Sequence, residues 1–355
     1  MRKKCVALLM LLVLFAGGCG PRHMKFSREF DGLFDTVTVV IGYAQSEREF
    51  NRFSEIIYTR MEELHRLYDI YNSYDGINNL KTVNENAGIA PVEVSGDIIG
   101  LLLLARESYD LSKGTVNAAL GAVLRIWHDY RAEGAANPAA ASLPPDAVLR
   151  EAADSADIGD LIIDEANGTV FLRKAGMSLD VGAIAKGYAA GLAVRAAEEA
   201  GMRSVLLNAG GNITAGGKPL DGARDRWSIG VQAPVPSPDG VQELADTIFF
   251  NGMTVSCSGG YQRFYTVGGV TYSHIIDPAT LMPAVRYKQV TVVHKDSGMA
   301  DMLATALFIL PYDEGVLLSA ECGAEALWID IDGHWRATEG YAGMSKTLGG
   351  RSAVD

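Results

Sequence analysis

The sequence predicts an α+β fold in which mixed or antiparallel sheets pack against helices. Segments rich in β-branched residues are more numerous than a regular alternation of strand and helix requires, which disfavours a doubly wound parallel sheet. With 355 residues, of which 48% are hydrophobic, the chain can bury the core of one large domain or of two smaller ones.

The first residues are typical of an export signal rather than of a folded segment. A basic start is followed by an apolar run at residues 5–15, and small residues precede Cys19. This arrangement resembles a bacterial lipoprotein signal, with residues 1–18 removed, Cys19 lipidated, residues 19–33 a tether and residues 34–355 the folded domain. An ordinary cleaved secretory peptide is the alternative, and both predict export. No later apolar run reaches the ~20 residues that a membrane span needs.

The first elements of the domain follow from local patterns. Residues 34–43 are rich in β-branched side chains and predict a strand. Ser46 and Glu49 have the spacing of a capping box, and the apolar residues after them recur at helical spacing as far as Tyr68. Residues 71–88 are rich in Asn and Gly, which predicts an irregular connection.

The middle of the chain adds helices and a hairpin. Helices are predicted at residues 97–111 and 118–130. Residues 131–146 hold three prolines and many alanines, which predicts a surface excursion. Residues 160–173 predict a hairpin that turns at the Asn-Gly pair of residues 167–168.

The last part of the chain is mostly short strands. Ser297 is the candidate cap of a helix at residues 299–310, and residues 235–240 form a loop rich in Pro and Ser. Strands are predicted at residues 227–232, 246–250, 253–258, 271–278, 289–294 and 326–332.

Residues 178–219 organise the rest of the chain. They predict a strand at residues 179–181, a turn of small residues, a helix at residues 184–201, a strand at residues 205–207 and a glycine turn. The backbone is therefore bare where a helix begins.

A bare helix start has a chemical use, because free N–H groups and the positive helix end can face a phosphate. Asp180 and Lys186 flank this backbone. Gly210 and Gly211 offer a second place where a planar ligand can lie on the main chain. A tight crossover that needs small residues for packing explains the same pattern equally well.

A second candidate site lies on the helix at residues 299–310. Asp301 and Thr305 are four residues apart and share a helix face, where they offer hard oxygen ligands suited to Mg²⁺ or Ca²⁺. The structural alternative is an Asp that favours the helix dipole and a Thr that bonds the preceding turn. His274 and Asp277 place an imidazole and a carboxylate near a strand end.

Charge and cysteine content exclude other functions. The formal net charge is −12 and there is no basic run, which argues against nucleic-acid binding. An acidic protein that binds a polyphosphate needs a cation or a local basic group. Cys257 and Cys322 show no framework spacing, so no essential disulfide is expected.

Taken together, several runs resemble the ApbE family of FAD:protein FMN transferases, from residue 34 to about residue 310. Each run alone is weak, but their order is specific. The runs are DVGAIAKGY (180–188), LNAGGN (207–212), SGGYQRFY (258–265), HIIDP (274–278) and ADMLATALF (300–308), with looser matches at SKGTVNAAL (112–120) and at Tyr74 with Asn84.

The resemblance implies an ApbE-type, T-fold-like architecture and a transferase domain at residues 34–355. It implies transfer of FMN from FAD to a Thr or Ser hydroxyl of a partner protein, with release of AMP. It also implies that Mg²⁺ is held by the Ala183 carbonyl, Asp301 and Thr305, and that His274 lies beside the reacting phosphate. The implied contacts to FAD are Tyr74, Thr115, Val116, Asn117, Asp180, Lys186, Gly210, Gly211, Ser258 and Ile275.

The implied chemistry agrees with the charge of the chain, since a metal and Lys186 can offset the diphosphate. A Thr hydroxyl is a poor nucleophile, so a base is expected, and His274, Asp301 and Asp277 remain the candidates. We assign His274, Asp301 and Lys186 as catalytic residues.

The chain departs from the family pattern at several positions, none of which is an implied metal ligand. Phe-Asp-Thr at residues 34–36 stands where many members have Met-Gly-Thr, and Asn117 and Asn212 stand where Asp is usual. Cys257 and Gly260 replace a Thr and an acid.

Two other functions remain open from the sequence. One is an FAD pyrophosphatase that passes FMN to water, and the other is a non-catalytic FAD-binding lipoprotein. The implied partner is an acceptor protein with a flavinylation motif, either a membrane redox subunit or an exported flavoprotein. The chain has no such motif of its own, so the acceptor is expected to act in trans.

Overall fold

The computed structural model describes residues 23–234, 243–261, 263–350 and 352. Its centre is an eight-stranded sheet whose described neighbours all pair antiparallel. In sheet order the strands are β1 (Met24–Leu33), β2 (Thr36–Ala44), β6 (Ser204–Ala209), β7 (Asn212–Gly217), β10 (Thr254–Gly259), β15 (Tyr287–His294), β16 (Glu325–Asp330) and β17 (Trp335–Ala337). The predicted α+β class is confirmed.

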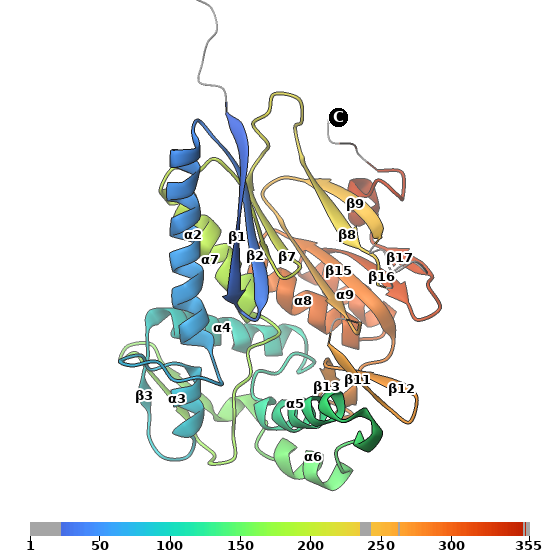
Figure 1. The fold of residues 1–355 in the computed structure, drawn as a ribbon. Coiled ribbons are helices and arrows are strands. Elements are labelled where there is room, and N and C mark those ends of the chain that lie inside the picture. The colour runs from blue at the N-terminus through green and yellow to red at the C-terminus, as the bar shows by residue number, and fades with distance from the viewer. Residues whose placement is uncertain (1–22, 235–242, 262, 351, 353–355) are drawn as a thin grey trace, which may run out of the picture.

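Three helices cover one face of this sheet: α2 (Glu47–Tyr68), α7 (Ala185–Glu199) and α8 (Ser297–Ile309) (Figure 1). Helices α7 and α8 approach so closely that Gly187 has no room for a side chain. A Cβ there would fall on the Ser297 carbonyl oxygen and 2.6 Å from the Asp301 Cβ.

The other face of the sheet is covered by the hairpin of β8 (Trp227–Gln232) and β9 (Leu244–Phe250) and by α10 (Glu339–Met344). Successive side chains of a strand point to opposite faces. In β16, Trp328 therefore joins the core under the helices, while Leu327 joins the core under the hairpin. Both faces of the sheet are buried, and we call these layers together the main body.

A second, smaller core lies at one end of the main body (Figure 1). It is formed by residues 120–156 and 264–283, which we call the small lobe. Trp127 anchors it, because its buried indole N–H donates to the Leu281 carbonyl at 2.9 Å. The lobe consists of α5 (Gly121–Ala136), η1 (Pro138–Ala140), α6 (Asp146–Ala153), β11 (Phe264–Val267), β12 (Val270–Ser273), β13 (Ile276–Asp277) and β14 (Met282–Pro283).

The remaining elements pack around the lower end of α2 and behind α8. They are α3 (Leu80–Glu85), α4 (Gly96–Leu111), η2 (Ile158–Asp160), α9 (Tyr312–Glu321) and a small sheet of β3 (Val92–Glu93), β5 (Thr169–Leu172) and β4 (Leu161–Asp164). The last two strands confirm the predicted hairpin at residues 160–173.

The expected tether at residues 19–33 is wrong from Met24 onward, because Met24–Leu33 pair with β2 as an edge strand. Phe26 and Phe30 lie on one face of that strand and pack against the core under α2, a period of two that the sequence carries. The lipoprotein signal at residues 1–18, Cys19 and the loop at residues 235–240 lie outside the described residues. Within the described part of the chain, no helix has the length and apolarity to cross a membrane.

Capping differs in detail from the sequence pattern. The Ser46 hydroxyl accepts from the Glu49 N–H at 3.2 Å, as predicted, but the Glu49 carboxylate accepts from Gln45 instead of Ser46. The predicted cap Ser297 is wrong, since the Asp296 side chain accepts from the Met299 N–H and so caps α8.

Three other predicted segments are corrected. Residues 179–181 form no strand, and the preceding residue, Ser178, makes an isolated bridge to Leu120. The irregular connection at residues 71–88 contains α3, which Asn79 caps with a capping box. The surface excursion at residues 131–146 is shorter than expected, because α5 continues to Ala136 before the prolines end it.

Candidate functional site

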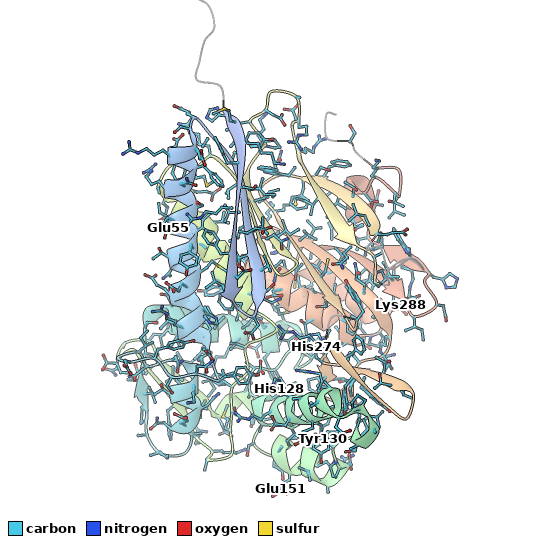
Figure 2. All side chains as sticks on the ribbon, in the orientation of Figure 1. Glu55, His128, Tyr130, Glu151, His274 and Lys288 are labelled. Carbon is cyan, nitrogen blue, oxygen red and sulfur yellow. The ribbon has the colours of Figure 1, made fainter. Side chains whose placement is uncertain are left out.

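A cavity of about 670 Å³ lies between the main body and the small lobe. Figure 2 shows His274 and His128 at this junction, where the two parts of the molecule meet. The main body contributes Phe34, His65, Tyr68, Gly182, Lys186 and Thr305 to the walls, and the small lobe contributes Trp127, His128, Arg131, His274 and Ile275.

The cavity gathers most of the residues that the sequence singled out. Residues far apart in the chain converge there, as the ordered motifs predict. Those that line it are Thr115, Val116, Asn117, Asp180, Ala183, Lys186, Gly210, His274, Ile275 and Thr305. Tyr74, Gly211, Ser258 and Asp301 do not line it.

Asp301 lies just behind the wall and holds the start of α7 in place. Its Oδ2 accepts from the Gly187 N–H at 2.8 Å, and its Oδ1 accepts from the Ser256 hydroxyl at 3.3 Å. Gly187 is the third residue of α7, whose N–H has no partner within the helix. A carboxylate from a distant helix therefore caps α7.

The same arrangement leaves the Ala183 carbonyl outside the helical hydrogen-bond ladder. The first bond of that ladder runs from the Tyr188 N–H to the Ile184 carbonyl at 3.0 Å. Thr305 lies one turn after Asp301 on α8 and reaches the cavity wall. Ala183 and Thr305 thus line the cavity, and the Asp301 carboxylate lies behind its wall, one helical turn before Thr305.

This donor set fits Mg²⁺, which takes hard oxygen ligands. Burial raises the pKa of Asp301, while the charge of Lys186 and the hydrogen bond from Gly187 oppose that rise. No group of three or more His, Cys, Asp or Glu that could hold a metal exists among the described residues, so a cation site here depends on Ala183 and Thr305 as well.

Asn212 is a neighbour of this corner whose role the sequence left open. It is buried, and its side chain hydrogen-bonds Asp301 and opposes the rise in the pKa of that carboxyl. Its Oδ1 atom has no hydrogen-bond partner among the described residues. The sequence marked Asn212 only by its position directly after Gly210 and Gly211, where the family usually has Asp.

Asn84 fixes the segment that carries Asp180. Its amide donates to the Leu179 carbonyl at 3.0 Å and accepts from the Leu179 N–H at 2.7 Å. The Asp180 carboxylate accepts from the Gly182 N–H at 2.8 Å. Burial raises the pKa of Asp180, and the charges of His128 and Arg131 oppose this. Asn84 is thus a positioning residue.

His274 faces the cavity from the small lobe with its ring fixed by the main chain. Both its N–H and its Nδ1 lie at the Arg263 carbonyl oxygen, at 3.0 and 3.1 Å. A carbonyl only accepts, so the ring carries its proton on Nδ1 and leaves the Nε2 lone pair free. Burial lowers the pKa of His274 to about 4, and the charges of Arg131 and Arg263 add to this, so the ring is neutral near pH 7.

Three cations line the cavity: Lys186, Arg131 and Arg263. None of them forms an ion pair within the described part of the chain. Arg131 is half-buried, and its guanidinium lies 3.1 Å from His128 Nδ1. The sequence placed Arg131 in a surface excursion, although the helical spacing of Trp127 and Arg131 carried the signal that α5 continues.

Three predicted contacts have other roles. The Tyr74 hydroxyl donates to Asp69 at 2.8 Å, and it is Tyr71 of the same loop that lines the cavity. Gly211 donates its N–H to Asn208. Asn117 lines the cavity, but its amide holds the local chain through bonds to Ala156 and Ala119.

Of the three candidate bases, His274 alone lines the cavity. Asp277 lies outside the cavity wall and accepts from the Ala279 N–H in a turn, and Asp301 is engaged by Gly187. Cys257 is not a nucleophile here, because burial raises its pKa to about 11. Both Cys257 and Cys322 are free thiols, as expected.

The tip of the β1–β2 hairpin lines the cavity through Phe34, Asp35 and Thr36. Phe34 and Asp35 both have positive φ, 52° and 53°, a conformation that non-glycine residues rarely adopt. His65 holds the tip, with its ring 5.4 Å from the Phe34 ring and its Nδ1 accepting the Phe34 N–H. An aromatic ring therefore lines the cavity where the sequence departs from the family pattern.

Comparison with known proteins gives one consistent result. The model of the ApbE family matches residues 34–328. An FAD:protein FMN transferase of Treponema pallidum is 32% identical over 377 aligned residues, which cover 100% of both chains. One of Klebsiella pneumoniae is 29% identical over 284 residues, covering 78% of this chain and 81% of its own.

Solved structures agree with the sequence comparison. The crystal structure of the ApbE protein of Thermotoga maritima superposes with a TM-score of 0.79 at 25% identity, covering 93% of this chain and 100% of its own. The apo flavinyl transferase ApbE of Pseudomonas stutzeri has a TM-score of 0.74 at 20% identity, and this likeness concerns the fold alone.

Proposed function

The chain belongs to the ApbE family and is an FAD:protein FMN transferase, and we propose that it uses Mg²⁺ to transfer FMN from FAD to a Ser or Thr hydroxyl of an acceptor protein, releasing AMP. One observation carries the mechanistic part of this proposal. The cavity joins Ala183, Thr305 and Lys186 of the main body to His274 of the small lobe.

The main body supplies the groups that manage the charge of the diphosphate. The Ala183 carbonyl, Asp301 and Thr305 would hold the Mg²⁺ ion. When bound, the ion neutralises negative charge on the diphosphate and stabilises the charge that develops there. Lys186 adds a unit charge of the protein's own on the same side.

The small lobe supplies the base. His274 Nε2 accepts the proton of the acceptor hydroxyl while the hydroxyl oxygen attacks the FMN phosphorus. The bond from that phosphorus to the bridging oxygen breaks in line, and its electron pair leaves with AMP. Atoms balance, since the acceptor gains FMN through a phosphodiester and loses one proton.

Substrate binding improves the base. Apart from burial, the cations Arg131, Arg263 and Lys186 lower the pKa of His274 to about 4 in the free cavity. An anionic diphosphate between these cations offsets their effect, because a nearby negative charge favours the protonated imidazole. The pKa of His274 therefore rises towards its ordinary value when FAD binds.

The test is an incubation of the purified protein with FAD, Mg²⁺ and an acceptor protein. We expect AMP in solution and an acceptor whose mass increases by one FMN group, in equal amounts. Free FMN with no acceptor adduct would instead support the pyrophosphatase. FAD retained for hours without AMP would support a non-catalytic flavin carrier.

We also propose that the protein is exported and anchored to the membrane by a lipid on Cys19, and that it modifies a membrane redox subunit or an exported flavoprotein in trans. The N-terminal sequence supports this proposal through its basic start, apolar run and small residues before the cysteine. Cells fed labelled palmitate should label the wild-type chain but not the Cys19→Ser variant.

A further inference from the structure

We propose that His65 is a positioning residue for substrate binding. It holds the strained tip of the β1–β2 hairpin, Phe34 and Asp35, in the conformation that presents the Phe34 ring to one planar ring of FAD. This inference rests on the proposed function, because FAD is taken as the ligand of the cavity. The proposed mechanism gives no role to this part of the cavity wall.

The tip is a two-residue turn with an unfavourable sequence. Leu33 pairs with Thr36, so Phe34 and Asp35 alone form the turn between β1 and β2. Both have positive φ, 52° and 53°, as in the two-residue hairpin turns that favour Asn followed by Gly. A phenylalanine and an aspartate in this conformation cost free energy, so the turn persists only where its surroundings stabilise it.

The surroundings support the tip from two sides. On one side, Thr36 lies against the β6–β7 turn, where a Cβ added to Gly210 would fall 2.8 Å from the Thr36 Cβ. On the other side, the Phe34 N–H donates to His65 Nδ1 at 3.3 Å, and the two rings meet edge to face at 5.4 Å. On its outer side, β1 has no neighbouring strand among the described residues. His65, near the end of α2, is therefore the side chain that fixes the Phe34 main chain.

The position of Phe34 indicates what the tip does. Phe34 is half-buried and lines the cavity together with His65 and Tyr68, whose ring centroid lies 6.4 Å from that of Phe34. FAD has two planar rings, isoalloxazine and adenine, joined through the diphosphate, and aromatic side chains bind such rings by stacking or edge-to-face contact. In the proposed mechanism the diphosphate lies with Lys186 and the cation ligands, so a ring of FAD remains for this aromatic wall.

Strain at the tip makes the hydrogen bond from Phe34 to His65 part of the binding free energy. The apparent Kd for FAD rises as the fraction of molecules with the tip in place falls. His65 therefore acts on FAD through Phe34. Asp35→Gly would make the turn favourable on its own and reduce the need for His65.

The test compares His65→Asn with His65→Leu. An Asn Oδ1 can take the place of His65 Nδ1 and accept the Phe34 N–H, whereas a Leu has a similar shape and no acceptor. The exposed His334, which does not line the cavity, gives the control His334→Leu. The Kd for FAD is measured by flavin fluorescence without Mg²⁺, so that FAD is not cleaved, and circular dichroism reports the folding of each variant.

We expect His65→Leu to bind FAD about three- to tenfold more weakly than His65→Asn, which is the net effect of one hydrogen bond. In the transfer assay its KM for FAD should rise as well, while kcat at saturating FAD changes less than about twofold. His334→Leu should match the wild type.

Asp35→Gly separates positioning from direct contact. Alone, it should change the Kd for FAD less than about threefold. Added to His65→Leu, it should recover most of the lost affinity, and should restore folding if His65→Leu alone is unstable. The negative charge that it removes is lost in both backgrounds, so the difference between the backgrounds reports the turn.

Titrations with FMN and with AMP identify the ring that Phe34 binds. FMN carries the isoalloxazine and AMP carries the adenine. We expect only one of the two compounds to lose affinity in His65→Leu.

Three results would overturn the proposal. The first is equal affinity for FAD in His65→Asn and His65→Leu. The second is a loss of affinity or of folding in His65→Leu that Asp35→Gly does not reduce, which would make His65 a direct contact of FAD or a residue of the core. The third is an equal loss for FMN and AMP, or a loss for neither. A wild type that does not bind FAD at all would instead refute the proposed function itself.

Discussion

The two sides of the cavity are built differently. The main-body side is close-packed: Gly187 has no room for a Cβ, and both oxygens of Asp301 accept hydrogen bonds. The small-lobe side has its own core and offers the Nε2 atom of His274 and the guanidinium of Arg131, which forms no ion pair among the described residues. In the proposed mechanism, the main-body side holds the cation and the small-lobe side meets the acceptor protein.

The difference shows how one cavity serves two substrates. A cation and a diphosphate need ligands held in place before binding, because a hard ion tolerates little error in geometry. An acceptor protein arrives anew in each turnover and needs a base instead. The predictions below separate the two sides, from the largest expected effect to the smallest.

The largest effect is expected on the main-body side, at Asp301. Asp301→Asn keeps a side chain of the same shape, so α7 retains a capping acceptor, but it removes the charge. We expect AMP release to fall about 10³-fold or more, because the stabilisation that a cation provides is worth several kcal/mol. Thermal unfolding monitored by circular dichroism should show a folded protein, and unchanged activity would remove Asp301 from the site.

His274 should give the next largest effect, on the small-lobe side. His274→Gln removes the base and should slow transfer about 10²-fold, the lower end for general base catalysis, since AMP is a good leaving group. The Kd for FAD in the presence of Mg²⁺ should stay within a few-fold of the wild-type value. A loss of FAD affinity as large as the loss of transfer rate would contradict the assignment of FAD binding to the main body and of the base to the small lobe.

Gly187 tests whether close packing of α7 against α8 holds the proposed cation ligands Ala183, Asp301 and Thr305 in place. Gly187→Ala places a Cβ against the Ser297 carbonyl and Asp301, so α7 and α8 must separate. We expect the free energy of unfolding to fall by about 1–3 kcal/mol. The Mg²⁺ concentration needed for half-maximal AMP release should rise. Gly343→Ala on α10, where the Cβ meets nothing within 4 Å, is the matched control and should leave both unchanged.

Asn84 tests the positioning of the Asp180 segment. Asn84→Ala removes both hydrogen bonds to Leu179 and leaves backbone groups unpaired, at a cost of about 1–3 kcal/mol in unfolding free energy. Urea unfolding measures this, and the KM for FAD should rise with it. Asn84→Asp keeps the acceptor for the Leu179 N–H, so its free energy of unfolding should lie between those of the wild type and Asn84→Ala.

The smallest effect is a shift in pH dependence. Because the pKa of His274 is lowered to about 4, kcat/KM for FAD should fall only when acid protonates the ring near that pH, and not near 6.5. Arg131→Gln removes one of the charges that lower this pKa, so the acid limb should move to higher pH. An acid limb at the same pH in this variant would show that the charge of Arg131 does not lower the pKa of His274.

Much of the site could be predicted from the sequence because its residues lie in local patterns. Asp301 and Thr305 are one helical turn apart, and Lys186 follows a bare helix start. That these residues lie near His274 was predicted from the order of the motifs, which matches that of the ApbE family. The α+β class followed from the number of β-rich segments.

The rest depended on contacts between distant parts of the chain. The sequence gives no local reason for Asn84 to bond Leu179, 95 residues away, or for Asp301 to cap a helix 114 residues earlier. Arg131 was missed because nearby prolines and alanines look like a loop, although α5 ends only at Ala136. Strand β1 was missed because its exposed face is polar and few apolar residues, Phe26, Phe30 and Leu33, mark its buried side.

The most direct test of this account is the binding of one divalent cation between Ala183, Asp301 and Thr305. Mn²⁺ can report it by electron paramagnetic resonance, in the His274→Gln background so that FAD turns over slowly. We predict about one tightly bound Mn²⁺ per chain when FAD is present, and loss of that signal when Asp301→Asn or Thr305→Val is added. Undiminished Mn²⁺ binding in both double variants would contradict the account.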